Sequence, residues 1–173
     1  SLGFDDEFLR FLFYRNLLDS YTHQYSNGCS RMDALPVTAL FRVFSPYTLS
    51  WPQKDGKVSL KLDLLSKENK FVTSGRAHEA MNDVEALISL CECLYKEQEM
   101  WLYSLDFFNK PKEDIRINNI KKECELNGKN FRLCLMLSSS FGSKVNYIAP
   151  VLYIGKSVIY KNQSLWVRLD MTD

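Results

Sequence analysis

Two side chains able to carry chemistry stand close together in the sequence, the imidazole of His78 and the carboxylate of Asp83. An imidazole accepts protons near neutral pH and a carboxylate holds cations, so a shared pocket would suit acid–base or metal chemistry. Five residues turn a helix by about 140°, so the two groups converge only if His78 lies on a loop entering the helix. The simpler interpretation is that Glu79 and Asp83 only stabilise a helix N-terminus, and on these residues alone it is the stronger one.

A second acidic group lies near the beginning of the chain. Asp5, Asp6 and Glu7 precede an apolar run with helical spacing, where carboxylates are common capping residues. The same side chains could supply oxygen ligands to Mg²⁺, which prefers carboxylates and keeps several waters. Both interpretations, cap and metal ligand, stay open at this point.

Charge is distributed unevenly along the chain. Residues 79–106 carry seven acidic side chains against Lys96, whereas residues 54–76 and 110–132 carry more Lys and Arg than acids. Aromatic residues, Phe107 and Phe108 among them, lie near the second basic segment. An acidic centre between basic and aromatic segments suits an enzyme that holds a phosphate backbone while a metal site cuts it. Ordinary solvated faces explain the same pattern.

The composition is that of an ordinary folded domain. The 173 residues include 22 Lys and Arg against 21 Asp and Glu, and 46% are hydrophobic. This length can bury a core without disulfides, and the abundant aliphatic and aromatic residues exclude disorder. No apolar run approaches the ~18 residues of a membrane span, and we see no secretory signal pattern. The net charge of +1 argues against a uniformly basic nucleic-acid binder.

The cysteines and histidines add little beyond His78. None of the five cysteines forms a Cys-x-x-Cys pair, which predicts reduced thiols and a cytoplasmic protein (Cys29, Cys91, Cys93, Cys124 and Cys134). The other histidine, His23, lies in a polar segment and is expected at the surface.

Helical periodicity dominates the first two thirds of the chain. Apolar residues recur at helical steps over 8–17, and Asp33 is placed to cap a second helix with Pro36 near its first turn. A short third helix is expected over 60–65. Residues 101–108 predict a further short helix or a linker, which Asn109-Lys110-Pro111 is expected to end. The longest helix should run from about residue 77 to about residue 97, with an apolar stripe made of Ala77, Met81, Val84, Leu87, Cys91 and Leu94.

After Pro111 the pattern changes to short β-prone runs separated by turn residues such as Asn127-Gly128. The runs cover residues 131–135, 147–148, 151–154, 158–160 and 165–169. They predict the start of a small antiparallel barrel or sandwich in the last third of the chain.

Several motifs, taken in order and spacing, resemble the bacterial exonuclease I family of single-strand-specific DNA exonucleases. They are Phe4-Asp5-Asp6-Glu7, Phe13-Tyr14-Arg15-Asn16, Ser30-Arg31-Met32-Asp33, Trp51-Pro52 and Ala77-His78-Glu79-Ala80-Met81-Asn82-Asp83. The similarity continues into Phe141-Gly142 and Tyr147-Ile148-Ala149-Pro150, so it covers nearly the whole chain. It implies an α/β (α+β) fold: the C-terminal part of a ribonuclease-H-like exonuclease domain of the DEDDh type, mostly helical, then the start of an SH3-like β domain.

The resemblance also implies roles for individual residues. Asp5 and Asp83 match metal-binding carboxylates of a two-Mg²⁺ site, and His78 matches the general base. The positions that match DNA-contacting side chains of the family are Arg10, Tyr21, Tyr25, Lys61 and Lys110. Aromatic residues there would stack on bases, and cations would follow phosphates.

The family's first motif, an Asp-x-Glu pair, would lie upstream of Phe4, and its C-terminal helical domain is not matched. We therefore expect a fragment that is inactive alone, with the second half of the exonuclease domain in residues 1–108 and a partial SH3-like domain in residues 109–173. The whole enzyme would degrade single-stranded DNA from its 3′ end to mononucleotides in DNA repair and recombination. Single-strand-binding protein would be a further partner.

Two other hypotheses stay open. One is a non-catalytic module that binds single-stranded nucleic acid on the same scaffold. The other is a DEDDh nuclease that acts on RNA.

Overall fold

The structure is a computed structural model that describes residues 5–25, 30–72 and 80–171. Helices fill the first two thirds and antiparallel strands the remainder, as the sequence predicts. The helices are α1 (Asp5–Arg15), α2 (Thr22–Tyr25), α3 (Ala34–Phe44), α4 (Leu62–Asn69), α5 (Ala80–Tyr95), α6 (Gln98–Leu105) and α7 (Lys110–Asn119). The strands are β1 (Gln53–Lys54), β2 (Lys57–Val58), β3 (Cys124–Leu126), β4 (Lys129–Leu137), β5 (Ile148–Lys156) and β6 (Ser164–Arg168).

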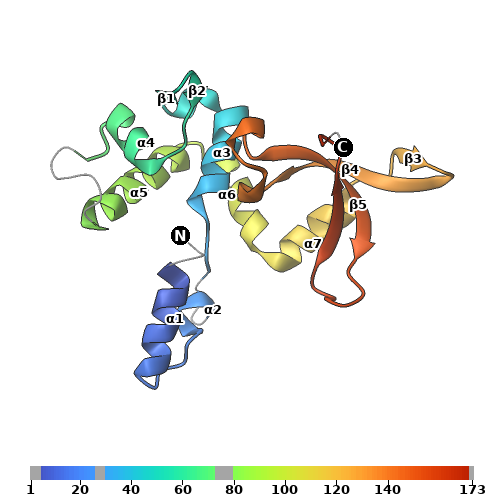
Figure 1. Cartoon of the computed structure of the whole chain (residues 1–173), viewed down its shortest axis with the longest axis horizontal. Helices are drawn as coiled ribbons and strands as arrows, with labels where there is room; N and C mark the ends of the chain where they lie inside the picture. The colour runs from blue at the N-terminus through green and yellow to red at the C-terminus, as the bar shows by residue number, and fades with distance from the viewer. Residues whose placement is uncertain (1–4, 26–29, 73–79, 172–173) are drawn as a thin grey trace.

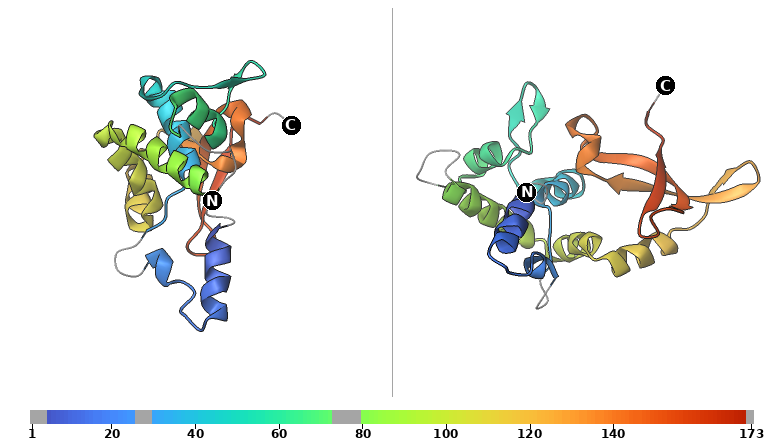
Figure 2. Two further views of the ribbon diagram at one scale, coloured as in Figure 1. Left: turned by 90° about the vertical axis from the view of Figure 1, so that its left-hand side faces the viewer. Right: turned by 60° about the horizontal axis from the view of Figure 1, so that its bottom comes forward.

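The elements are arranged around α3. Figure 1 shows α4 and α5 on one side of α3, the sheet with α7 on the other, and α1 with α2 projecting below. The left view in Figure 2 also places α1 and α2 at the end of the molecule opposite the β1–β2 hairpin. The helical core and the sheet are therefore neighbours, while α1 and α2 form an outlying pair.

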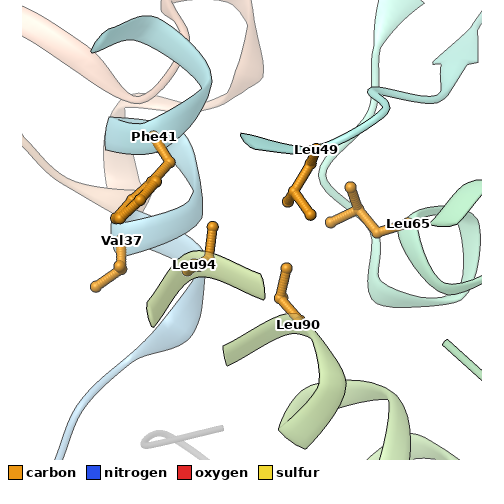
Figure 3. Close-up of a cluster of buried hydrophobic side chains, with 6 residues drawn as sticks. All are labelled: Val37, Phe41, Leu49, Leu65, Leu90 and Leu94. Carbon is orange, nitrogen blue, oxygen red and sulfur yellow. The ribbon is translucent and has the colours of Figure 1, made fainter. Parts of the chain in front are cut away.

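The core of the helical part joins residues far apart in the sequence (Figure 3). It consists of Val37 and Phe41 of α3, Leu49 of the following loop, Leu65 of α4, and Leu90 and Leu94 of α5. Fully burying one such side chain contributes about 1.5–3 kcal/mol, so this cluster holds three helices together. Asp33 caps α3 as predicted, since its carboxylate accepts a hydrogen bond from the Leu35 amide at 3.0 Å.

The buried side of α5 differs from the predicted stripe. Ala86, Leu90 and Leu94 are buried at four-residue steps. Of the predicted stripe, Leu94 is buried as expected, whereas Met81, Val84 and Leu87 are exposed. The helix has apolar residues on more than one side, and periodicity alone does not show which side meets α3 and α4. In its first half, Met81, Val84 and Leu87 remain exposed, whereas Ala86 is buried.

A helix after Pro111 contradicts the expectation of strands from that residue on. Asn109 caps α7 by accepting a hydrogen bond from the Lys112 amide at 3.2 Å, and Pro111 occupies the first turn. Proline suits that position because its missing N–H would have no helical partner there. The Asn-Lys-Pro signal thus starts a helix where the sequence was expected to end one.

The C-terminal sheet has the order β3-β4-β5-β6, with every neighbouring pair antiparallel. Asn127 and Gly128, both with positive φ, make the predicted turn between β3 and β4. The run 158–160 is a loop and not a strand, although Val158 and Ile159 are apolar, because the two strands it joins pair only up to Lys156 and Ser164. Hydrophobic type alone does not make a strand where the chain reverses.

Two expectations about composition can be compared with the described residues. The cysteines among them, namely Cys91, Cys93, Cys124 and Cys134, are free thiols as predicted. No helix in the described ranges has the length and apolar character needed to cross a membrane.

Candidate nucleic-acid interface

Two of the predicted DNA-contacting residues lie against each other. The guanidinium carbon of Arg10, on α1, is 5.4 Å from the ring centroid of Tyr21, which directly precedes α2. Tyr21 keeps 46% of its surface exposed. A cation over an aromatic face is attracted by the ring, and a half-exposed ring still offers surface for stacking. The pair combines a cation of the kind that binds phosphate with an aromatic ring of the kind that stacks on a base.

A polar cluster next to this pair joins α1 to α2. The Asp6 carboxylate accepts hydrogen bonds from His23 Nε2 at 2.9 Å, Gln24 Nε2 at 2.7 Å and Arg31 Nη1 at 2.6 Å. The His23 side chain is only 18% exposed, which corrects the expectation of a surface histidine. Its ring also meets Phe13 edge to face at 5.3 Å between centroids. Asp6 is thus neither a plain helix cap nor available to a metal, because both its oxygens are engaged.

The three residues predicted to be catalytic are described to different extents. Asp5 is the first residue of α1, and nothing is described of its side chain. His78 lies outside the described residues. Asp83 lies in the first turn of α5 and is exposed, so its carboxylate is accessible to a cation.

The donors available for a metal are therefore few in the described ranges. No group of three His, Cys, Asp or Glu side chains able to hold a metal ion is found among the residues that the structure describes. The exposed carboxylate of Asp83 is an oxygen donor of the kind that hard divalent cations prefer. The donor type fits a divalent ion, and Asp83 can contribute to such a site.

Lys61 contributes to a basic groove at another place. It directly precedes α4 and lines, with Lys54 and Lys57 of the β1–β2 hairpin, a groove of about 520 Å³. Tyr147 of the sheet region also lines it, and Asp55 is its one acidic lining residue among those described. The hairpin lies far from α1 in Figures 1 and 2, so the structure does not bring this groove next to the Arg10–Tyr21 pair. Lys54 and Lys57 were counted in the basic segment but not singled out, since their convergence with Lys61 depends on the hairpin.

The two remaining predicted contacts are less informative. Tyr25 ends α2, and its side chain is not among those described. Lys110, in the first turn of α7, donates a hydrogen bond from Nζ to the Asn162 carbonyl. That bond ties α7 to the loop between β5 and β6, so this ammonium has a structural partner.

A mostly apolar cavity of about 820 Å³ separates the helices from the sheet. Arg116 is one of the residues that line this cavity. Its guanidinium carbon lies over the rings of Tyr103 and Phe107, 4.3 Å and 4.1 Å from their centroids. Burial raises the pKa of the neighbouring Glu113 carboxyl, although the charge of Arg116 acts in the opposite direction. Burial also raises the pKa of the Cys134 thiol on the sheet side. Both groups are therefore biased toward their neutral forms at the seam between helices and sheet.

Comparison with known proteins tests the resemblance. Exodeoxyribonuclease I of Buchnera aphidicola (from Acyrthosiphon pisum) is 33% identical over 155 residues, which are 89% of this chain and 35% of that protein. The structure also matches Escherichia coli exonuclease I bound to a dA16 oligonucleotide, with TM-score 0.79 and 26% identity over 96% of this chain and 34% of that one. The chain is a homologue of part of exodeoxyribonuclease I. It spans about a third of the length of that relative, and no protein-family model matches it.

Two further structures of exonuclease I extend this match. One is the zinc-bound form of an exonuclease I complex with single-stranded DNA, with TM-score 0.75 and 27% identity over 96% of this chain and 34% of that one. The other contains exonuclease I with SSB and an inhibitor, with TM-score 0.72 and 25% identity over 95% and 34%. The predicted fold class is confirmed, because the chain matches exonuclease I, a nuclease with a ribonuclease-H-like domain, and its described residues form helices and small antiparallel sheets.

Proposed function

We propose that this chain is part of an exonuclease that hydrolyses single-stranded DNA from its 3′ end and releases mononucleotides. The observation that carries the proposal is the match over 96% of the chain to exonuclease I with a bound oligonucleotide. The Arg10–Tyr21 pair supports it, since it offers one group for phosphate and one for a base. DNA repair and recombination are the processes in which such an activity serves.

The metal site would use Asp5 and Asp83 as oxygen ligands. A matched structure of exonuclease I with a zinc ion bound supports the use of a divalent ion. We propose Mg²⁺ because carboxylate oxygens are its preferred ligands. When bound, two such ions stabilise the charge on the attacking and leaving oxygens. Asp6 is not part of the set, since its oxygens accept bonds from His23, Gln24 and Arg31.

His78 would act as the general base for the attacking water. A neutral imidazole can take a proton near pH 7, and a positioned base of this kind contributes about 10²–10⁴-fold. Arg10 and Tyr21 would hold the strand near the reacting end, and Lys61 would bind phosphates in its basic groove. Tyr25 and Lys110 complete the proposed contacts.

The wider setting follows from the same homology. Single-strand-binding protein is a proposed partner, because a matched structure contains exonuclease I together with SSB. We place the boundary between the exonuclease domain and the SH3-like domain at residues 108 and 109, where η3 (Asp106–Phe108) meets the cap of α7. A cytoplasmic location agrees with the free thiols of the described cysteines.

The proposal is tested with a 3′-labelled single strand, a 5′-labelled single strand and a blunt duplex. The coding sequence upstream of Ser1 is read first, and any in-frame segment with an Asp-x-Glu strand is included in a longer chain assayed beside the 173-residue one. We expect Mg²⁺-dependent release of the 3′ label by the longer chain only. Binding without cleavage by both chains would favour a non-catalytic module, and preferential cleavage of an RNA strand would favour an RNA nuclease.

A further inference from the structure

Asp6 is the most heavily engaged carboxylate among the described residues of the interface. Its side chain is 12% exposed, and its two oxygens accept bonds from three side chains that lie 17 to 25 residues further along the chain. Bonds between a carboxylate and a charged donor such as Arg31 are roughly twice as strong as neutral ones. This cluster therefore fixes a tertiary contact and not just a helix end.

The contacts of α1 with α2 follow one face of the helix. Asp6, Arg10 and Phe13 are spaced by four and three residues, so they lie on one side of α1. Asp6 meets His23 and Gln24, Arg10 lies over Tyr21, and Phe13 meets the edge of the His23 ring. Asp6, at the centre of the polar cluster, and Arg10, which would bind phosphate, thus lie on the same face of α1.

Apolar burial does not set the rotation of α1 about its own axis. Phe11, Leu12 and Tyr14 on its other sides are each more than half exposed. A helix that buries no broad apolar stripe needs another constraint to fix its orientation. The polar cluster centred on Asp6 supplies this constraint.

We propose that Asp6, through His23, Gln24 and Arg31, is a positioning residue that seats α1 on α2 and so holds Arg10 and Tyr21 together as a preformed contact for a single strand. This inference rests on the proposed function. Preorganised groups bind better because less conformational freedom is lost on binding. Asp6 itself does not touch the strand.

The sign of the change in affinity distinguishes a positioning role of Asp6 from simple charge repulsion between Asp6 and the strand. A carboxylate beside a phosphate-binding arginine repels nucleic acid, so removing its charge alone should tighten binding. A positioning role predicts instead that removing the Asp6 carboxylate weakens binding. Glu7 is the matched control, because its side chain is 60% exposed and is not part of the polar cluster centred on Asp6. Its Oε1 lies 3.9 Å from Arg10 Nη2, so it is also a carboxylate close to Arg10.

The first experiment measures binding of a fluorescein-labelled dT oligonucleotide to the 173-residue chain by anisotropy. We expect Asp6→Ala to weaken affinity about tenfold, which corresponds to the loss of one or two charge-assisted bonds. Asp6→Glu should recover most of the affinity, since it restores the carboxylate. Glu7→Ala should bind as tightly as the wild type or more tightly.

A second measurement needs no nucleic acid. Hydrogen exchange of the α1 amides should rise about tenfold in Asp6→Ala and stay unchanged in Glu7→Ala. If Asp6→Ala does not fold, Gln24→Ala removes a single hydrogen bond and should weaken affinity about threefold with a smaller rise in exchange.

The outcomes separate this inference from the proposed function. Unchanged affinity and exchange in Asp6→Ala, together with weaker binding by Arg10→Ala, would overturn the positioning role and leave the proposed function intact. Absence of binding by the wild type, or wild-type affinity in both Arg10→Ala and Tyr21→Ala, would overturn the proposed contact pair and the inference with it.

Discussion

The guanidinium of Arg10, on α1, lies over the ring of Tyr21, 5.4 Å from its centroid, although Tyr21 is eleven positions further along, in the turn before α2. Both residues were assigned to DNA contact only because their positions match the exonuclease I family. Their proximity supports that assignment, because it places a cation and a half-exposed aromatic ring within reach of one nucleotide.

Replacing Tyr21 by Ala should weaken the binding of single-stranded DNA by about five- to a hundredfold, because stacking of one base on an aromatic ring contributes ~1–3 kcal/mol. Tyr21→Phe keeps the ring and should bind within about twofold of the wild type. Arg10→Ala should lower the slope of log affinity against log salt by about 0.7, since one phosphate contact is lost. Fluorescence anisotropy over a salt series measures all three variants.

Equal affinities for Tyr21→Ala, Tyr21→Phe and the wild type would remove Tyr21 from the interface. Tyr47 is a suitable control for the substitution, since it is an exposed tyrosine elsewhere on the surface. Tyr47→Ala should leave the affinity unchanged.

Local signals in the sequence predicted the elements whose ends have side-chain partners nearby in the chain. Asp33 was recognised as a cap because its partner, the Leu35 amide, lies two residues away. Asn109 likewise accepts from an amide three residues away, but the Asn-Lys-Pro segment is compatible with the end of one helix as well as with the first turn of the next. The buried side of α5 needed knowledge of α3 and α4, which no local pattern contains.

The resemblance, and not spacing alone, singles out the candidate site residues. On the residues themselves, Asp5, Asp6 and Glu7 were equivalent, and nothing indicated that Asp6 binds His23, Gln24 and Arg31. These contacts depend on the turn between α1 and α2, which folds α2 back against α1. A hydrogen-bond network between such distant residues leaves no periodic trace in the sequence.

Leu94 and Leu87, both on α5, should respond differently to truncation. Leu94 is fully buried among α3, α4 and α5, so Leu94→Ala should lower the free energy of unfolding by about 2–5 kcal/mol. Leu87 is 39% exposed, so Leu87→Ala should cost much less. Urea unfolding followed by circular dichroism measures both. Equal losses would mean that the predicted stripe, and not the observed one, faces the core.

Asn109→Ala should destabilise α7 by about 0.5–2 kcal/mol, because the side chain that accepts from the Lys112 amide is removed. Asn119, exposed at the other end of the same helix, is the matched control. Asn119→Ala should leave the unfolding midpoint unchanged. A midpoint for Asn109→Ala equal to that of the control would show that the cap contributes nothing to stability.

Glu113→Gln should stabilise the protein at pH 7. Burial raises the pKa of the Glu113 carboxyl in the folded state above its unfolded value of about 4.3, so ionisation at neutral pH opposes folding. The gain in stability of Glu113→Gln over the wild type should be fully present above the pKa of Glu113 in the folded state. It should disappear as the pH falls below the pKa of Glu113 in the unfolded state. Thermal melts from pH 3.5 to 7.5 measure it, with the exposed Glu123→Gln as control. A Gln variant that is less stable at pH 7 would show that the contact with Arg116 outweighs burial.

Asp83→Asn should abolish metal-dependent cleavage without affecting the fold. Asp83 is exposed in the first turn of α5, so its loss should change stability little, whereas loss of a metal-binding carboxylate should lower the cleavage rate by about a hundredfold or more. The assay uses the longest form of the protein that releases a 3′ label with Mg²⁺. Asp63→Asn is the matched control, because Asp63 is also exposed in the first turn of a helix, α4, and has no proposed role. Anisotropy in EDTA should show unchanged strand affinity for both variants. A full cleavage rate in Asp83→Asn would exclude this carboxylate from the metal site, and an equal loss in Asp63→Asn would point to a general effect of charge.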